Sequence, residues 1–139
     1  LIKFPWLSES KNLFQNNWVA EIRLAEMYYI VAECMFREND KAGAAKMLDA
    51  VRKRNFPADK WAANSYEANP AKLTEDEFVD ELGREFLGER HRRTDLIRWK
   101  RYGNEWWDKP VDTRDNTIFP IPKNQLTSNE LLKQTTPGF

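Results

Sequence analysis

The chain contains one cysteine, one histidine and no apolar run long enough to cross a membrane. A lone Cys34 excludes an intramolecular disulfide framework, a CxxC redox motif and a zinc ribbon, because each needs at least two cysteines. Lys plus Arg and Asp plus Glu both total 22, so no field of one sign favours nucleic acid or an anionic bilayer as a partner. A membrane span would need about 18 consecutive apolar residues.

The opening residues also lack the features of a secretory signal. LIKFPWLSES has neither a basic region nor an apolar core, and it does not begin with Met. We expect residue 1 to be a processed end or an artificial boundary, so any lipoprotein signal or membrane anchor would lie outside these residues. A length of 139 residues suits one domain.

What the sequence does contain is dense helical periodicity. Residues 18–37 are predicted to form a well-buried helix, and Cys34 is expected to be buried within it as a small apolar side chain. Its main apolar stripe consists of Ile22, Ala25, Tyr29, Ala32 and Phe36.

A second amphipathic helix is predicted over residues 40–54. Asn39 and Asp40 provide a break and an N-cap, and the apolar face then follows at helical spacing. Small alanines on both helices favour close packing, so we expect an antiparallel hairpin similar to those of helical repeat proteins. The apolar face consists of Ala44, Leu48 and Val51.

Two further helices follow a segment without periodicity. Residues 55–72 contain two Pro and three Asn, which predicts a long loop. A Thr-x-x-Glu capping box at Thr74 predicts the start of a third helix. A fourth is predicted over residues 92–102, with Gly103 ending it. The buried face of the third helix is expected to contain Phe78, Leu82 and Phe86.

The remaining residues predict little regular structure. Residues 104–117 are polar, and IFPIP should be extended without forming a central strand, because proline has no N–H to donate. One short helical turn is expected around Leu126. The predicted fold is therefore all-α, a single domain over residues 1–139. In it, a tetratricopeptide-like hairpin and two more helices are crossed by an irregular Pro-rich C-terminal segment.

Five stretches follow one another along the chain: EIRLAEMYYIVAE, LDAVRKR, residues 74–99, IFPIPKNQL and QTTPGF. In this order they resemble motifs of the SusD/RagB family. The sharpest match, residues 74–99, is similar to the family's Glu-Arg-x-x-Glu and Glu-Gly-x-Arg-x-x-Asp-Leu-x-Arg segments. The matching residues there are Glu81, Glu85, Glu89, Arg92, Asp95, Leu96, Arg98 and Trp99. The departures include Asp49 for the usual Asn, Leu82 for Arg and Arg90 for Gly.

The resemblance implies the C-terminal portion of a longer helical lipoprotein, anchored on the outer face of the outer membrane. It further implies oligosaccharide binding and a SusC-like TonB-dependent transporter as partner. The family's glycan-contacting aromatics lie mostly in the N-terminal half and in variable loops, which this chain largely lacks.

The acids Glu81, Glu85 and Glu89, together with Arg92, Asp95 and Arg98, form the densest charged pattern. Their helical spacing suits paired carboxylate–guanidinium contacts. Such a cluster is either an acid/base site or a structural network that joins two helices, and we expect the second. A glycosidase would need two carboxylates about 5–9.5 Å apart with separated pKa values, and nothing in the spacing selects such a pair.

Candidate glycan contacts are aromatic rings near polar groups. Trp106 and Trp107 precede Asp108, and Trp61 and Tyr66 lie on the predicted loop. A ring can stack on the apolar face of a pyranose while a carboxylate accepts hydrogen bonds from its hydroxyls. The alternative is that at least one of the adjacent Trp side chains packs into the core.

The sequence predicts no catalysis, no cofactor and no metal. His91 has no second ligand at metal-binding spacing, so we expect a hydrogen bond at a helix junction. The favoured function is non-catalytic capture of an oligosaccharide or similar nutrient for uptake, and the alternative is a helical module that docks on the transporter without touching glycan. The first predicts a solvent-facing ring beside polar groups, whereas the second predicts that the Trp rings are buried or line a protein interface.

Overall fold

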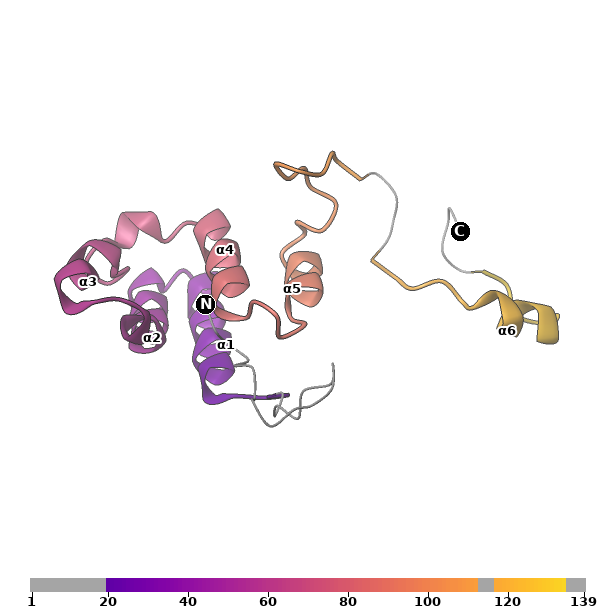
Figure 1. The fold of residues 1–139 in the computed structure, drawn as a ribbon, viewed down its shortest axis with the longest axis horizontal. Coiled ribbons are helices and arrows are strands. Elements are labelled where there is room, and N and C mark those ends of the chain that lie inside the picture. Colours follow the sequence, from indigo (N-terminus) through magenta and orange to yellow (C-terminus); the bar gives the residue numbers. More distant parts are fainter. Residues whose placement is uncertain (1–19, 113–116, 135–139) are drawn as a thin grey trace, which may run out of the picture. The chain divides into compact units, whose positions relative to one another are not determined.

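The computed structural model describes residues 20–112 and 117–134, which fall into two compact units with a boundary between Glu89 and Arg90. These residues contain helices and no strand, so the all-α prediction is confirmed (Figure 1). The first unit contains α1 (Leu24–Arg37), α2 (Lys41–Arg52), η1 (Lys53–Asn55), α3 (Ala58–Asn64), η2 (Pro70–Lys72) and α4 (Glu75–Glu85). The second contains α5 (Arg92–Arg98) and α6 (Lys123–Ser128).

Some predictions stay open. Trp18 and the Pro137–Gly138 ending lie outside the described residues. The single domain and the C-terminal segment crossing the helices remain predictions. No helix in the described part of the chain is both long and apolar enough to cross a membrane.

The hairpin of α1 and α2 is confirmed, and two residues make its turn. Asn39 adopts a left-handed conformation (φ 67°), and its N–H donates to the Phe36 carbonyl at 3.1 Å. The Asp40 N–H donates to the Met35 carbonyl at 2.8 Å, which completes a Schellman ending. The Asp40 carboxylate then accepts from the Gly43 N–H at 2.8 Å and caps α2. One helix therefore ends where the next begins, and the two pack against each other.

The first helix is shorter and less buried than predicted. It begins at Leu24, and residues 20–23 are not helical. Its inward face buries Ala25, Tyr29 and Ala32, whereas Ile22 is 75% exposed. Cys34 is exposed, so the prediction of a buried thiol is wrong. The predicted apolar stripe is thus the inward face, but periodicity did not reveal that a second apolar face of this helix stays exposed.

The core of the first unit forms where α1, α2 and α4 supply side chains. Tyr29, Leu48, Tyr66, Leu73 and Phe78 are fully buried. The Tyr29 ring meets Phe86 edge to face, with centroids 5.2 Å apart. The predicted helix start at Thr74 is confirmed, because the Thr74 side chain accepts from the Glu77 N–H at 3.2 Å. Only this half of the predicted capping box forms, because the Thr74 N–H donates to the Lys72 carbonyl at 2.9 Å. The predicted buried faces of α2 and α4 are confirmed.

The predicted loop over residues 55–72 is wrong, because it contains α3 and η2. Pro57 immediately precedes α3 with φ −59°, a value already close to helical, and Pro70 occupies the first turn of η2. Prolines that suggested irregular structure therefore start helices here.

The fourth predicted helix ends early. In α5 the last helical residue is Arg98, and Lys100 takes the left-handed conformation (φ 57°). The Arg101 N–H donates to the Leu96 carbonyl at 2.7 Å and the Lys100 N–H to the Ile97 carbonyl at 3.0 Å. A Schellman ending at Lys100 thus replaces the predicted stop at Gly103. The predicted turn around Leu126 is confirmed as α6.

Candidate functional site

The acids of α4 and the turn after it are held by arginines from earlier in the chain. Arg23 donates from Nη1 to Glu85 Oε1 and from Nε to Glu89 Oε2, both at 2.6 Å, and from Nη2 to the Glu85 carbonyl at 2.9 Å. Arg54 also pairs with Glu85. Burial lowers the pKa of Arg23, but the hydrogen bonds to Glu89 and Glu85 and the charges of these two carboxylates together raise it by more. Arg23 therefore remains a cation that joins the start of α1 to the end of α4.

Glu81 is the centre of a second cluster and is 4% exposed. Its carboxylate accepts from the Tyr29 hydroxyl at 2.8 Å and from Arg84 Nε at 2.9 Å, and it lies 3.1 Å from Arg52 Nε. Burial, together with the charge of Glu81, raises the pKa of Tyr29 far above its ordinary value. Both oxygens of Glu81 are thus engaged inside the protein, which suits a structural carboxylate and leaves no lone pair facing a substrate.

Asp49 organises the chain after α3. It is 5% exposed, and its two oxygens accept from the Ser65 hydroxyl at 2.6 Å, the Tyr66 N–H at 3.1 Å and the Glu67 N–H at 2.9 Å. Arg52 donates to the same carboxylate at 3.1 Å. A single buried acid therefore satisfies the backbone of the turn that follows α3.

This geometry favours the structural network over the acid/base site. Its arginines include Arg23, Arg52 and Arg54, which pair with Glu85 or Glu81 from at least 29 residues earlier in the sequence. In the second unit, Arg98 pairs with Asp95 of its own helix at 3.0 Å. Asp95 and Trp99 are buried there.

The second unit presents an exposed tryptophan on a tight turn. Trp106 and Lys109 exchange two backbone hydrogen bonds, with the Trp106 N–H donating at 2.8 Å and the Lys109 N–H donating at 3.1 Å. Trp107 and Asp108 form the tip between them, as in a two-residue hairpin. Trp107 is 96% exposed, and Asp108 is exposed beside it. The turn therefore holds an indole almost fully in solvent.

Trp106 faces the other way and is half-buried. The Arg92 guanidinium lies 5.0 Å from the centroid of its ring. The two adjacent Trp side chains thus lie in different environments, one half-buried and one exposed. Neither is part of the core of the described residues, so the alternative of a core-packed Trp at this position is not confirmed.

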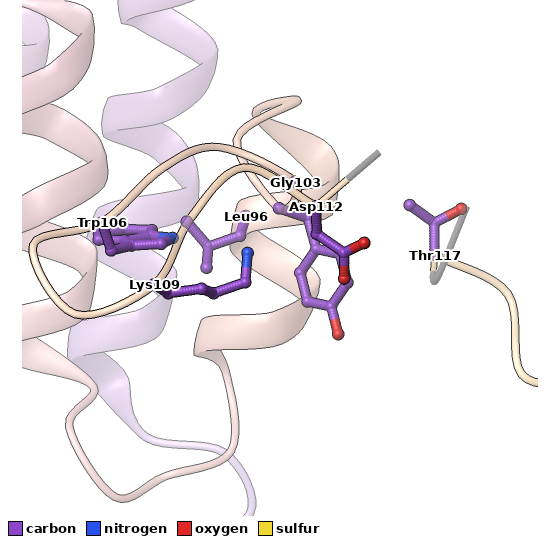
Figure 2. A pocket seen from close by; sticks show the side chains of 7 residues that line it. Leu96, Gly103, Trp106, Lys109, Asp112 and Thr117 are labelled. Carbon is purple, nitrogen blue, oxygen red and sulfur yellow. The ribbon is translucent and has the colours of Figure 1, made fainter. Parts of the chain in front are cut away.

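A cavity of about 300 Å³ lies beside this turn. Figure 2 shows Leu96 between Trp106 and Asp112, with Lys109 alongside. Gly103 closes the base of the loop, because the Asp112 N–H donates to its carbonyl at 3.0 Å. A Cβ on residue 103 would come within 2.8 Å of the Asp112 carbonyl oxygen, so only glycine allows this approach. The cavity is lined by Leu96, Tyr102, Gly103, Trp106, Lys109, Asp112 and Thr117.

An arginine that sequence reasoning did not single out contacts Tyr102 and Thr117, two of the residues that line this cavity. Arg93 lies 4.2 Å from the Phe119 ring centroid and 5.2 Å from that of Tyr102, and it donates to the Thr117 carbonyl at 3.1 Å. The IFPIP segment is thereby attached to α5. Nothing in the spacing of Arg93 signalled this contact, because its partners lie up to 26 residues away.

The other two aromatic candidates lie in the first unit. Trp61 sits on α3, is half-buried, and its ring centroid is 5.9 Å from that of Phe56. Tyr66 is 2% exposed, with the Arg52 guanidinium 3.6 Å from its ring centroid and its hydroxyl donating to Glu77 at 2.5 Å. Burial, together with the hydrogen bond to Glu77, raises the pKa of Tyr66. Tyr66 therefore has no free face on which a sugar could stack.

The remaining candidate for chemistry is the single histidine, His91. His91 precedes α5, where its carbonyl accepts from the Thr94 hydroxyl at 2.7 Å. The hydrogen bond expected from its imidazole remains a prediction. In residues 20–112 and 117–134, no group of three His, Cys, Asp or Glu side chains is arranged to hold a metal ion.

Comparison with known proteins gives a consistent result. The model of the SusD family matches residues 3–139. A SusD-like protein of Formosa agariphila is 27% identical over 96% of this chain, and the starch-binding protein SusD of Bacteroides thetaiotaomicron is 31% identical over 81% of it. The aligned regions cover 28% of the first relative and 20% of the second. No solved structure matches the chain significantly.

Proposed function

The chain belongs to the SusD family, and on that premise we propose that it is the C-terminal portion of a longer cell-surface protein that captures an oligosaccharide or similar nutrient without cleaving it. The longer protein would be lipid-anchored in the outer membrane and would deliver its ligand to a SusC-like TonB-dependent transporter. That one relative is a starch-binding protein supports a glycan as ligand.

The observation that carries the proposal for this part of the protein is the exposed indole of Trp107. An indole that is 96% exposed buries almost no apolar surface on folding, although a two-residue turn holds its backbone in place. Stacking on the apolar face of a pyranose would cover the ring, while Asp108 beside it can accept hydrogen bonds from sugar hydroxyls. We therefore propose Trp107 and Asp108 as glycan contacts, with the cavity lined by Trp106 and Lys109 accommodating an adjoining sugar.

The pairing of the buried carboxylates with arginines supports a binding role without catalysis. Glu81 and Glu85 are buried and paired with arginines, so neither is placed to give or take a proton at a glycosidic oxygen. Of the residues described as lining the cavity near Trp107, Asp112 alone has a carboxylate. Glycoside hydrolysis by the usual route needs two.

The alternative function is docking on the transporter with no glycan contact in this chain. An exposed Trp can also insert into a protein partner. The two functions differ in one consequence. If Trp107 contacts glycan, removing its ring weakens the binding of a soluble polysaccharide, whereas a Trp107 that only docks on the transporter leaves that binding unchanged.

Affinity electrophoresis tests the proposal. The 139-residue chain and the longer protein are run through native gels that contain soluble polysaccharides, starch among them, and reducing ends are then assayed. We expect retardation of the longer protein, a smaller retardation after Trp107→Ala, and near-normal retardation after Trp107→Phe, which keeps a ring. If Trp107→Ala changes nothing, this turn is not a glycan contact and docking becomes the better account. New reducing ends would overturn the non-catalytic assignment.

A further inference from the structure

The formal charge of the chain is zero, but its charged residues are unevenly distributed. Residues 20–89 carry 15 acidic and 10 basic side chains, whereas residues 90–112 carry four acidic and seven basic ones. The stretch that contains the Trp107 turn therefore has a net charge of +3 within a neutral chain, and a local excess of one sign attracts ligands of the opposite sign. Its basic residues are Arg90, Arg92, Arg93, Arg98, Lys100, Arg101 and Lys109.

Lys109 brings one of these positive charges into the cavity beside the turn. It is half-buried and lines the cavity together with Leu96 and Trp106 (Figure 2). Its ammonium group donates to the Asn104 carbonyl at 3.4 Å, which is longer than the usual range of about 2.7–3.2 Å. No carboxylate among the described residues pairs with it, and this includes Asp112 of the same cavity. An ammonium group has three N–H donors, so Lys109 retains donors for a ligand.

The acids near this cavity do not cancel the attraction that Lys109 exerts on an anion. Glu105 and Asp108 belong to the same turn, but both are exposed, so water and salt screen their charges more strongly than that of a half-buried group. Asp112 is the one carboxylate among the described lining residues, and it can accept hydrogen bonds from sugar hydroxyls. The cavity therefore combines a hydroxyl acceptor with a cation that has no counterion.

The turn holds this cation close to the exposed ring. Trp107 lies at the tip of the turn and Lys109 at its base, and two backbone hydrogen bonds between Trp106 and Lys109 keep the turn closed. We propose that the glycan is acidic, and that a carboxylate or sulfate ester on one of its sugars pairs with Lys109 while a neighbouring sugar stacks on Trp107. Both anions accept charge-assisted hydrogen bonds from an ammonium group. This inference rests on the proposed function and names the class of glycan within it.

Matched polysaccharides test the proposal in affinity electrophoresis of the longer protein. Polygalacturonate and alginate are each compared with their esterified forms, and dextran sulfate is compared with dextran, so that the two members of a pair differ in charge. Mobility is expressed relative to a gel without polysaccharide. We expect an acidic member to bind at least about tenfold more tightly than its neutral counterpart, as one charge-assisted hydrogen bond would provide. The pair that shows the difference distinguishes a carboxylate from a sulfate ester.

Two lysine variants separate the cavity from the general charge of this unit. Lys109→Met keeps the length of the side chain and should remove the preference for the acidic polysaccharide. Lys100→Gly removes the same charge from an exposed position whose φ of 57° suits glycine, and it should keep the preference. An unchanged preference in Lys109→Met would overturn the proposal. Equal losses in both variants, or equally effective competition by a single-stranded oligonucleotide, would show that any polyanion binds through net charge and would overturn it as well.

The same gels separate this inference from the proposed function. Retardation by neutral polysaccharides alone, starch among them, would overturn the acidic-glycan proposal and leave glycan capture standing. No retardation by any of the polysaccharides would overturn both.

Discussion

Replacing Glu81 by Gln keeps the size of the side chain and removes its charge, so it isolates what the buried carboxylate does. Glu81 lies between Tyr29, Arg52 and Arg84. The Gln amide can accept through one oxygen only, and its nitrogen would face a donor. Arg52, itself 5% exposed, would retain Asp49 and the Asn64 carbonyl as partners.

The expected cost follows from these contacts. Breaking a buried ion pair costs about 3–5 kcal/mol when the remaining charge is left alone. Arg52 keeps a second acid, so the loss should be closer to that of charged hydrogen bonds, about 2–3 kcal/mol in the free energy of unfolding. Out of a total stability of about 5–15 kcal/mol, this is a large fraction.

Urea unfolding followed by far-UV circular dichroism measures this cost. The control is Asp59→Asn, because Asp59 and Lys60 form an exposed pair 3.9 Å apart whose loss should change stability by less than about 0.5 kcal/mol. A Glu81→Gln variant as stable as this control would refute the structural role of the carboxylate. The acid/base alternative would then regain weight.

Three further predictions follow from the same contacts. Asp49→Ala removes the acceptor for the Ser65 hydroxyl and for two backbone N–H groups, so it should lower the free energy of unfolding in urea by about 3 kcal/mol or more. Amide hydrogen exchange at Tyr66 and Glu67 should become faster, because their N–H groups lose this acceptor. Unchanged exchange at these two residues would contradict the prediction. A lysine at position 23 cannot reach both Glu85 and Glu89, so Arg23→Lys should lower the free energy of unfolding by about 1–3 kcal/mol even though the charge is kept. Unchanged stability of this variant would mean that the charge alone matters. The raised pKa values of Tyr29 and Tyr66 keep both phenols protonated in the folded state, whereas in the unfolded chain they ionise near pH 10. The contribution of these two groups to stability should therefore be constant below pH 10 and fall above it. Tyr29→Phe should flatten that fall, and an unchanged slope would show that Tyr29 is not responsible.

Local signals in the sequence predicted local structure well. Asp40 and Thr74 are caps that accept from N–H groups three residues later, so their role is visible in the sequence itself. The inward face of α2 was also predictable, because its outer face is polar and the contrast is sharp.

Contacts between distant segments could not be predicted in the same way. Arg23 reaches Glu85 and Glu89, which are 62 and 66 residues away, and no periodicity encodes that distance. The helix ending at Lys100 was missed because a lysine rarely takes the left-handed conformation, and Gly103 nearby looked like the obvious stop. The glycine usual in the family at position 90 has a physical reason, since Arg90 there has φ 66°.

The candidate glycan contacts differ in how far their rings are exposed, which the sequence did not reveal. Trp107 is the ring that faces solvent beside a polar group, as glycan capture requires, whereas Tyr66 is buried. Two adjacent tryptophans in a sequence do not reveal which will pack. Here the two-residue turn decides, because it places Trp107 at the tip and Trp106 at the base.

The most direct test of the central claim is a calorimetric titration of the longer protein with oligosaccharides cut from whichever polysaccharide retards it. Wild type, Trp107→Ala and Trp107→Phe are compared under identical conditions. Loss of one stacked ring should weaken binding by about 1–2 kcal/mol, or about 5–30-fold in Kd, and Phe should recover most of it. Identical Kd values for all three proteins would contradict the claim that this turn of the chain touches glycan.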